Sequence, residues 1–247
     1  MLVDATVETQ RQGTVRTKGV VLRRLDTSTG DRNIYFFLKR YGPTWVFAPG
    51  AGRGKIRFGG ATDPLIWSIV DIYRTPSRVY LKNLDVKDDF WALRKMPKRL
   101  RLAMEWARVL SSTLMVQQEN DNILALFYWS MKFLENPKVP STLIEWRFFW
   151  RWLKLWGTAP EIRVCHECGK EKAKGWYLTK EGVFCADCKM GKNGGIAIDS
   201  TLLTVLKNSA FLKKADFVEW SSRLDLVDSL VIKKCNKLLI EALQETV

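Results

Sequence analysis

Histidine is almost absent from this chain, since His166 is the only one among 247 residues. This histidine lies between Cys165 and Cys168, in the turn of a C-x-x-C pair, so the sequence offers no Ser-His-Asp or Cys-His arrangement, in which a histidine serves as the general base. Neither an HExxH nor a GxSxG motif occurs, so the common signatures of zinc proteases and α/β-hydrolases are missing as well. The sequence therefore predicts a non-enzymatic protein.

Long hydrophobic runs are also lacking. The most apolar stretch, residues 144–156, is broken by four charged side chains, so it cannot span a bilayer. The first residues show no basic region followed by an apolar one, and hence no signal peptide. We therefore expect a cytoplasmic protein with no membrane partner. In that reducing compartment, clustered cysteines are metal ligands more often than disulfides.

Acidic residues are scarce relative to basic ones. The chain has 26 Asp and Glu against 40 Lys and Arg, which gives a formal net charge of +14 and a pI near 9.7. Residues 1–89 carry +6 of this surplus, residues 90–110 carry +5, and the remaining 137 residues only +3. A surplus of this size favours a polyanionic partner, and nucleic acid ahead of a membrane surface because nothing in the chain inserts.

Hydrophobic periodicity divides the chain into two parts. Between residues 17 and 88, β-branched and aromatic runs are separated by Gly, Pro or Asp, which predicts five short strands. The runs are residues 19–22, 33–38, 44–48, 65–73 and 79–81. Five strands in this length suit a small barrel such as an OB-fold, although periodicity alone does not separate it from an SH3-like barrel. The predicted fold class is α+β and multidomain, with this barrel followed by a mostly helical domain that contains a zinc ribbon.

The spacing of apolar residues becomes helical after residue 90. Pro97 is placed to begin one helix, residues 123–134 form a second, and Ser141 can N-cap a third that stops at Gly157. Asp199 begins a short helix and residues 223–244 a longer closing one. The predicted divisions are a flexible tail (1–13), an OB-fold (14–89), a first helical part (90–162), the zinc site (163–195) and a second helical part (196–247).

Four of the five cysteines form two C-x-x-C pairs, Cys165 with Cys168 and Cys185 with Cys188, with 16 residues between them. Zinc takes four soft ligands in a tetrahedron, and each pair supplies two from one tight turn. A redox motif needs only one pair, and a catalytic zinc keeps an open position, so both fit less well than a closed structural site. Four thiols without metal remain the alternative. The sequence predicts one structural Zn²⁺ held by these four cysteines.

The residues between the pairs support a zinc ribbon. Residues 176–178 and 183–184, joined through 180–182, have the pattern of a small hairpin. His166 lies inside the first pair, and with four cysteines available we interpret it as a turn residue rather than a ligand. Cys235, on the predicted closing helix, is interpreted as a buried or half-buried single thiol.

A glycine-rich basic loop, residues 50–60, stands out in the strand-rich part. Arg53, Lys55 and Arg57 alternate with small or apolar residues, and such a loop can follow a phosphate backbone without reading base sequence. No Gly-Lys-Ser/Thr closes it, so it is not a Walker loop. Other candidate DNA contacts are Arg23, Arg24, Arg32, Lys39, Arg40, Lys98, Arg99 and Arg101. Tyr35, Phe36 and Phe58 could stack on bases but are first expected in the core.

Several of these stretches resemble the RecO family of bacterial recombination mediators. The N-terminal matches are residues 19–23 (GVVLR), 30–34 (GDRNI), 40–42 (RYG) and 48–58 (APGAGRGKIRF). The central ones are residues 144–148 (IEWRF), 155–160 (LWGTAP), the two cysteine pairs, Gly169, residues 175–177 (GWY) and Gly182. They cover most of the chain in the family's order, although Asp63 and Ile56 replace the Gln and Ser that are usual there.

The resemblance implies a DNA repair protein that binds single- and double-stranded DNA and anneals complementary strands. With its partner RecR, such a protein helps load RecA onto strands coated by single-strand-binding protein, whose acidic tail docks on the helical domain; no residues are assigned to that docking. It also implies DNA contacts at Arg53, Lys55 and Arg57, zinc ligation by the four cysteines, and a cytosolic, nucleoid-associated location. Two other functions stay open: an RNA-binding factor, since barrels and ribbons of this kind serve RNA equally well, and a zinc-dependent enzyme acting on nucleic acid.

Overall fold

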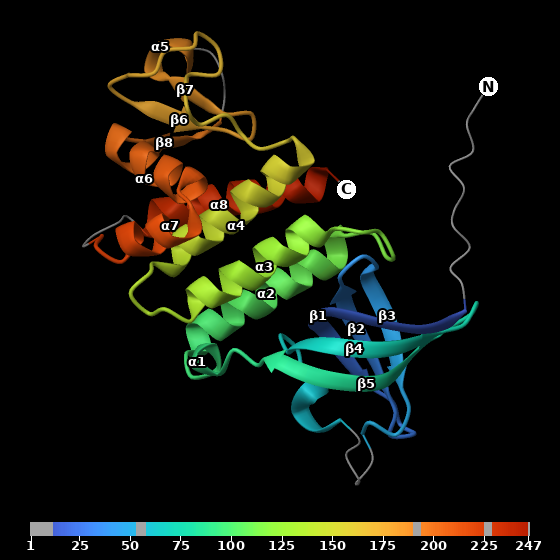
Figure 1. The fold of residues 1–247 in the computed structure, drawn as a ribbon. Coiled ribbons are helices and arrows are strands. Elements are labelled where there is room, and N and C mark those ends of the chain that lie inside the picture. The colour runs from blue at the N-terminus through green and yellow to red at the C-terminus, as the bar shows by residue number, and fades with distance from the viewer. Residues whose placement is uncertain (1–11, 53–57, 190–193, 225–228, 247) are drawn as a thin grey trace, which may run out of the picture. The chain divides into compact units, whose positions relative to one another are not determined.

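The structure is a computed structural model that describes residues 12–52, 58–189, 194–224 and 229–246. The chain divides into two compact units, Met1–Leu124 and Ala125–Val247, and each is described by itself (Figure 1). Within the described ranges, every helix is too short or too polar to cross a membrane.

The first unit contains a closed barrel of five strands, as the sequence predicted. The strands are β1 (Gly13–Asp26), β2 (Arg32–Leu38), β3 (Gly42–Ala48), β4 (Trp67–Arg74) and β5 (Val79–Asp88), with a 3₁₀ turn, η1 (Gly59–Thr62), before β4. Their order around the barrel is β1-β2-β3-β5-β4, and all neighbours are antiparallel except β3 and β5. This is the strand order of an OB-fold, so the SH3-like alternative is excluded.

Alternation along the strands fills the barrel. Ile34, Phe36 and Leu38 of β2 point inward and are fully buried, together with Val46 of β3 and Val70 of β4. Successive side chains on a strand face opposite ways, so the residues between these belong to the outer surface of the barrel. The outer surface of β3 is therefore defined by the odd-numbered positions Trp45 and Phe47.

Two helices follow the barrel in the first unit. α1 (Trp91–Arg94) is a single turn, and α2 (Pro97–Thr113) begins with Pro97 in its first turn, as predicted. One face of α2, including Ala103, Trp106 and Leu110, is buried, and the helix packs against β1. A segment of residues 114–120 then leads into α3 (Asp121–Leu134), which continues into the second unit.

In the second unit, α4 (Ser141–Trp156) is the central element. It is buried on most of its surface and packs against α6 (Ser200–Phe211) and α8 (Ser229–Glu245). Its predicted C-terminus is confirmed, because Gly157 has a φ of 78° and the N–H of Thr158 donates to Leu153 O at 3.0 Å, as in a Schellman motif. The predicted N-cap is wrong: Pro140 holds the N-cap position, and Ser141 is already helical.

Two arginines of α4 bind the C-terminal end of α6. Arg147 is 1% exposed and donates to Ser209 O and, at 2.7 Å, to Leu212 O. Arg151 donates to Ala210 O at 2.9 Å and to Leu212 O at 2.9 Å. Burial and the neighbouring charge of Arg151 lower the pKa of Arg147 to about 9, which leaves it protonated at neutral pH. Cations at a helix C-terminus satisfy carbonyls that have no partner within the helix.

The later helices differ in part from expectation. Asp199 caps α6 as predicted, since its side chain accepts from the N–H of Leu202 at 2.6 Å. α7 (Lys214–Ser221) was not predicted, and the closing helix α8 begins at Ser229 rather than at Arg223, which lies in a turn. The segment between them has no glycine or proline to mark the boundary, so composition alone extended the helix too far.

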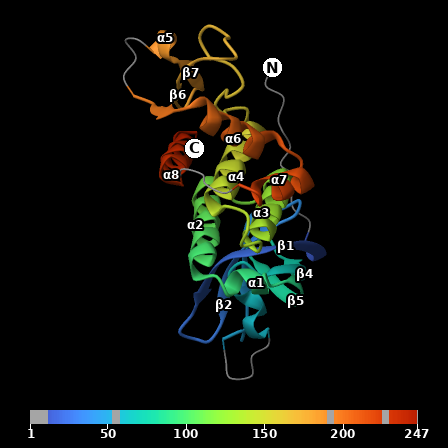
Figure 2. The same ribbon diagram turned by 90° about the vertical axis from the view of Figure 1, so that its left-hand side faces the viewer.

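The cysteine-bearing segment lies between α4 and α6 in sequence and forms its own small sheet. β6 (Trp176–Leu178) pairs with both β7 (Val183–Cys185) and β8 (Ile196–Ile198), and α5 (Ala186–Lys189) follows β7. Figures 1 and 2 both place this sheet and α5 at one end of the helices α4, α6 and α8. The predicted hairpin is confirmed, and β8 is a third strand that sequence reasoning missed.

Candidate metal centre and barrel surface

Four cysteines converge at one end of the small sheet. The Sγ atoms of Cys165, Cys168, Cys185 and Cys188 all lie within 4.8 Å of one another, and Cys168 Sγ is 3.8 Å from Cys185 Sγ. A disulfide would need about 2.05 Å, so these are separate thiols. A tetrahedron with metal–sulfur bonds of about 2.3 Å has edges of about 3.8 Å. The group could therefore hold one metal ion.

Backbone hydrogen bonds shape the first pair into a tight turn. The N–H of Gly169 donates to Cys165 O at 2.9 Å, and the N–H of Cys165 donates to Lys170 O at 2.8 Å. Gly169 has a φ of 70°, a left-handed conformation that glycine adopts without strain. The N–H of His166 donates to Val183 O at 2.8 Å, which ties this turn to β7.

The second pair comes from a strand end and a helix start. Cys185 is the last residue of β7, and Cys188 lies one turn later in α5. The N–H of Cys185 points at Cys165 Sγ, at 3.4 Å. Cys165 and Cys185 are buried, Cys188 is half-buried and Cys168 is exposed. The four sulfurs therefore come from two places: the turn that contains Cys165 and Cys168, and the junction of β7 with α5. Hydrogen bonds to β7 of the β6–β7 hairpin hold the two places together.

Two of the four sulfurs, those of Cys165 and Cys188, have pKa values shifted in opposite directions. Burial raises the pKa of Cys165, but backbone N–H groups of Cys168, Cys185 and Glu167 outweigh it and lower the pKa to about 6. Hydrogen bonds with the side chains of Cys168 and Cys185 raise the pKa of Cys188 to about 12. The negative charge of the Cys165 thiolate also raises the pKa of Cys188, because like charges oppose each other. A divalent metal would supply the compensating charge.

Metal affinity is expected to fall as the pH is lowered, because protons compete with the metal for thiolates. The pKa of Cys165 lies below its ordinary value of 9.0, so this thiol is ionised at neutral pH and gains its proton as the pH falls through about 6. Cys188 is neutral at that pH and must release a proton on binding. For each proton that the metal displaces, the metal affinity falls about tenfold for every unit by which the pH is lowered. Competition with a chromophoric chelator at several pH values measures this, and an affinity independent of pH would contradict it.

The other two candidate ligands lie outside the cluster. His166 is not a member of the ligand group, and its ring packs edge-on against Phe184 with the centroids 5.4 Å apart. Cys235 is fully buried on α8, and burial raises its pKa to about 12. Both observations agree with the roles that the sequence suggested for these two residues.

The basic residues proposed for DNA contact fall into several environments. Arg53, Lys55 and Arg57 lie outside the described residues. Arg24 forms ion pairs with Asp63 and, at 3.3 Å, with Asp26, while Arg32 pairs with Asp26 at 2.9 Å. Those two guanidinium groups are therefore already partly neutralised within the barrel, and a phosphate would have to compete with the carboxylates.

Lys39 and Arg40 lie at the β2–β3 turn beside two cations that sequence reasoning missed, Arg16 and Lys18 of β1. Together they border a depression of about 370 Å³. Arg16 pairs with Asp71 at 3.1 Å. Among the residues that the structure describes, no carboxylate forms an ion pair with the side chain of Lys18, Lys39 or Arg40, and the carboxylate of Asp121 accepts from the backbone N–H of Arg40 at 2.7 Å. This basic depression offers charge that is free to meet a phosphate.

The three α2 candidates differ in exposure. Lys98 and Arg101 are exposed in the first turns of the helix. Arg99 is half-buried, and burial lowers its pKa. Arg23 is exposed on β1, with its guanidinium carbon 5.9 Å from the centroid of the Trp45 ring. Arg99 is therefore the least accessible of these cations.

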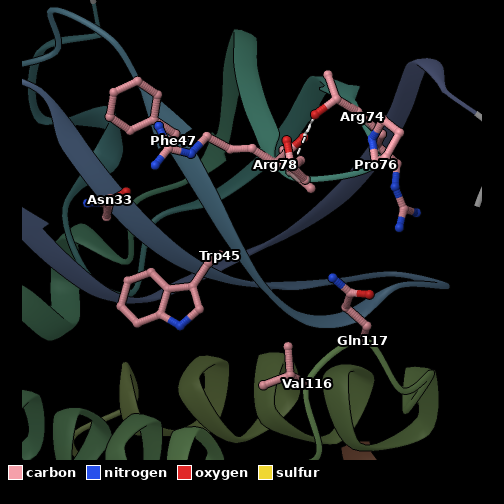
Figure 3. Close-up of a pocket in the computed structure, with 11 residues that line it drawn as sticks. Asn33, Trp45, Phe47, Arg74, Pro76, Arg78, Val116 and Gln117 are labelled. Atoms are coloured by element: carbon pink, nitrogen blue, oxygen red, sulfur yellow. Dashed lines mark hydrogen bonds between the residues drawn. The ribbon is translucent and has the colours of Figure 1, made fainter.

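A larger hollow lies on the outer surface of the barrel and was not anticipated. It measures about 640 Å³, and the residues that line it include Trp45, Phe47, Arg74 and Arg78 (Figure 3). Tyr35 and Phe36 are buried and Phe58 packs against the barrel interior, in agreement with the expectation that these rings belong first to the core. Alternation along β3, with buried residues at 44, 46 and 48, was the pattern that could have marked Trp45 and Phe47 as outward.

Fold and site together define a class of protein: an OB-fold barrel with a basic surface, joined to a helical unit that carries four cysteines placed to hold a metal ion. Residues 97–224 match the family described as "Recombination protein O C terminal". This is more than half of the chain, and the chain belongs to the RecO family of DNA repair proteins.

Individual relatives agree over most of their length. The chain is 24% identical to the DNA repair protein RecO of Acetivibrio thermocellus over 218 residues, which are 87% of each chain. It is 25% identical to RecO of Caldanaerobacter subterraneus subsp. tengcongensis over 70% of this chain and 71% of the relative. It is 28% identical to RecO of Anaeromyxobacter sp. (strain K) over 72% and 71%.

Proposed function

We propose that this chain is a non-enzymatic mediator of DNA repair and homologous recombination that binds single- and double-stranded DNA and anneals complementary strands. With RecR it would help load RecA onto strands coated by single-strand-binding protein. The tail of the single-strand-binding protein would dock on this chain. The protein would act in the cytoplasm, at the nucleoid. The observation that carries this proposal is a basic OB-fold barrel in a chain of the RecO family. The finer steps rest on the family resemblance.

The barrel would act by charge. Annealing forms and breaks no covalent bond, so it needs only that two phosphate backbones be brought together. Cations such as Lys39 and Arg40 screen the repulsion between strands, and the release of counterions supplies most of the binding free energy. Arg53, Lys55 and Arg57 would extend this surface, and exposed Lys98 and Arg101 would add to it.

The metal centre would hold one zinc ion in a structural role. The donors are four thiolates, which zinc prefers in closed sites, and their spacing suits its bond length. Four protein ligands fill the tetrahedron, so no position remains for water or substrate. The zinc would join the turn of Cys165 and Cys168 to the end of β7. Elemental analysis of the purified protein should find about one zinc per chain.

Strand annealing tests the proposed function. Complementary oligonucleotides coated with single-strand-binding protein should pair much faster when this protein is added, and RecR should change loading of RecA but should not be needed for annealing itself. The measurement is the fluorescence of a dye–quencher pair on the two strands. A protein that binds DNA but leaves the pairing rate at its spontaneous value would overturn the mediator role, and tighter binding to RNA than to DNA at matched salt would favour the RNA-binding alternative.

A further inference from the structure

The hollow on the outer barrel surface has the composition of a binding site. Its volume of about 640 Å³ is within the range of ligand pockets, roughly 300–1,000 Å³. It lies between β3, the β4–β5 turn and the segment after α2, all in the first unit. The charged residues that line it are Arg74 and Arg78, and no acidic residue is among the described residues of its lining. The hollow therefore favours an anionic ligand with apolar parts.

Its base is an aromatic platform. Trp45 is 39% exposed, although large apolar side chains on this barrel are mostly buried. The Tyr35 ring lies behind it with centroids 4.7 Å apart and an angle of 34° between the planes, and the two residues are direct partners in the β2–β3 register. Tyr35 is buried and packs against the indole, whereas Trp45 itself remains partly exposed to solvent.

A second ring and two cations stand beside this platform. Phe47 follows two positions later on the same side of β3, with Asn33 as its partner on β2. Figure 3 shows Asn33 between the two rings and Arg78 reaching to Phe47, where the guanidinium carbon is 4.7 Å from the ring centroid. Arg23 stands at 5.9 Å from Trp45 on the β1 side. Arginine pairs well with both aromatic rings and phosphates.

Hydrogen bonds within the β4–β5 turn fix the backbone at Arg78 before any ligand binds. Thr75 Oγ1 donates to Arg78 O at 2.8 Å and accepts from the N–H of Arg78 at 3.0 Å, and the N–H of Thr75 donates to Arg78 O at 2.9 Å. These bonds close the turn on itself, as the dashed lines in Figure 3 show. Arg78 is exposed, so its charge can meet a ligand without rearrangement of the backbone.

We propose that this hollow is a stacking subsite for unpaired bases of a single strand, in which Trp45 takes the face of a base and Arg23 and Arg78 take the flanking phosphates. The proposal rests on the proposed DNA-binding function and adds a basis for telling single strands from duplex. Bases in a duplex are already stacked on each other, whereas an unpaired base has a free face. The amide of Asn33 can donate to or accept from the edge of such a base.

The test compares Trp45→Ala with Trp91→Ala in the full-length protein. Trp91 is a matched control, since it is 62% exposed in the same unit with Lys95 Nζ 5.4 Å from its ring centroid, but it does not line the hollow. Stacking of one base contributes about 1–3 kcal/mol. Trp45→Ala should therefore weaken binding of an unstructured single strand by about 5- to 150-fold. Trp91→Ala and Trp45→Phe should change it little, and all variants should bind duplex DNA as the parent does.

An abasic strand of equal length separates bases from phosphates. The parent should bind it more weakly than the normal strand by about the factor lost in Trp45→Ala, and Trp45→Ala should bind both strands alike. If Trp45→Ala keeps full affinity for single strands, or loses single-strand and duplex binding equally, the subsite is overturned while the DNA-binding function stands. If Trp45→Ala keeps full affinity for single strands, the occupant of the hollow would be a protein partner instead. A parent that binds neither form of DNA would instead overturn the proposed function.

Discussion

If the four cysteines hold a structural metal, replacing Cys185 by serine is expected to abolish metal binding and to destabilise the second unit. Cys185 is fully buried at the end of β7, and its N–H and its sulfur both face the other ligands. Three thiolates bind zinc much more weakly than four, and metal-binding free energy at such a site is folding free energy. Loss of a structural metal is among the few single changes that cost more than about 4 kcal/mol.

The measurement is thermal unfolding together with elemental analysis. The melting temperature of Cys185→Ser should fall by about 10 °C, as a change of this size implies for a chain of this length. Cys235→Ser is the matched control, because it also buries a hydroxyl in place of a fully buried thiol but lies outside the cluster. It should keep the metal and lose only about 1–2 kcal/mol of stability. Equal metal content and equal melting in the two variants would contradict a structural metal at these cysteines.

Reversing the charge of the glycine-rich loop is expected to weaken single-stranded DNA binding by about 100-fold or more. The triple change Arg53→Glu, Lys55→Glu and Arg57→Glu replaces three attractions for phosphate by three repulsions in the most basic part of the chain. Charge acts at long range, so the effect requires only that the loop face the bound strand. Fluorescence anisotropy with a labelled single strand measures the change.

The control variant changes the net charge by the same amount, but at residues that are far from the loop in sequence. Lys233, Lys234 and Lys237 are exposed on α8, and their replacement by glutamate produces the same difference of six charges. If binding depends on the barrel, this second triple variant should lose far less affinity. A similar loss in both variants would show that binding follows total charge and has no preferred surface.

Much of the fold was predictable because local rules agree with the tertiary structure. Runs of β-branched and aromatic residues gave the five barrel strands, and Pro97, Gly157 and Asp199 marked helix boundaries that the structure confirms. The cysteine cluster was predictable because the spacing of C-x-x-C pairs is itself a geometric requirement of a four-sulfur site. These features depend on residues close together in the chain.

The rest depended on contacts that sequence does not display. Arg24 and Arg32 looked like free cations, but Arg24 pairs with Asp63 from the far end of another segment, and Arg32 pairs with Asp26, which it faces across the β1–β2 register. The segment after α2 helps to line the hollow beside Trp45, from more than 60 residues away in sequence. Aromatic residues of a barrel divide between inside and outside according to register, so Phe36, which lies in the core, and Trp45, which lies on the outer surface, could not be told apart by composition.

The salt dependence of single-stranded DNA affinity tests the central claim most directly, since that claim is that the barrel gathers phosphates through its free cations. For a single strand, the logarithm of the association constant falls with the logarithm of the salt concentration, with a slope of about −0.7 for each phosphate neutralised. The parent should show a slope steeper than about −3, and the loop triple variant should be shallower by about 2. A slope near zero, or one that the triple change leaves as it was, would contradict the account.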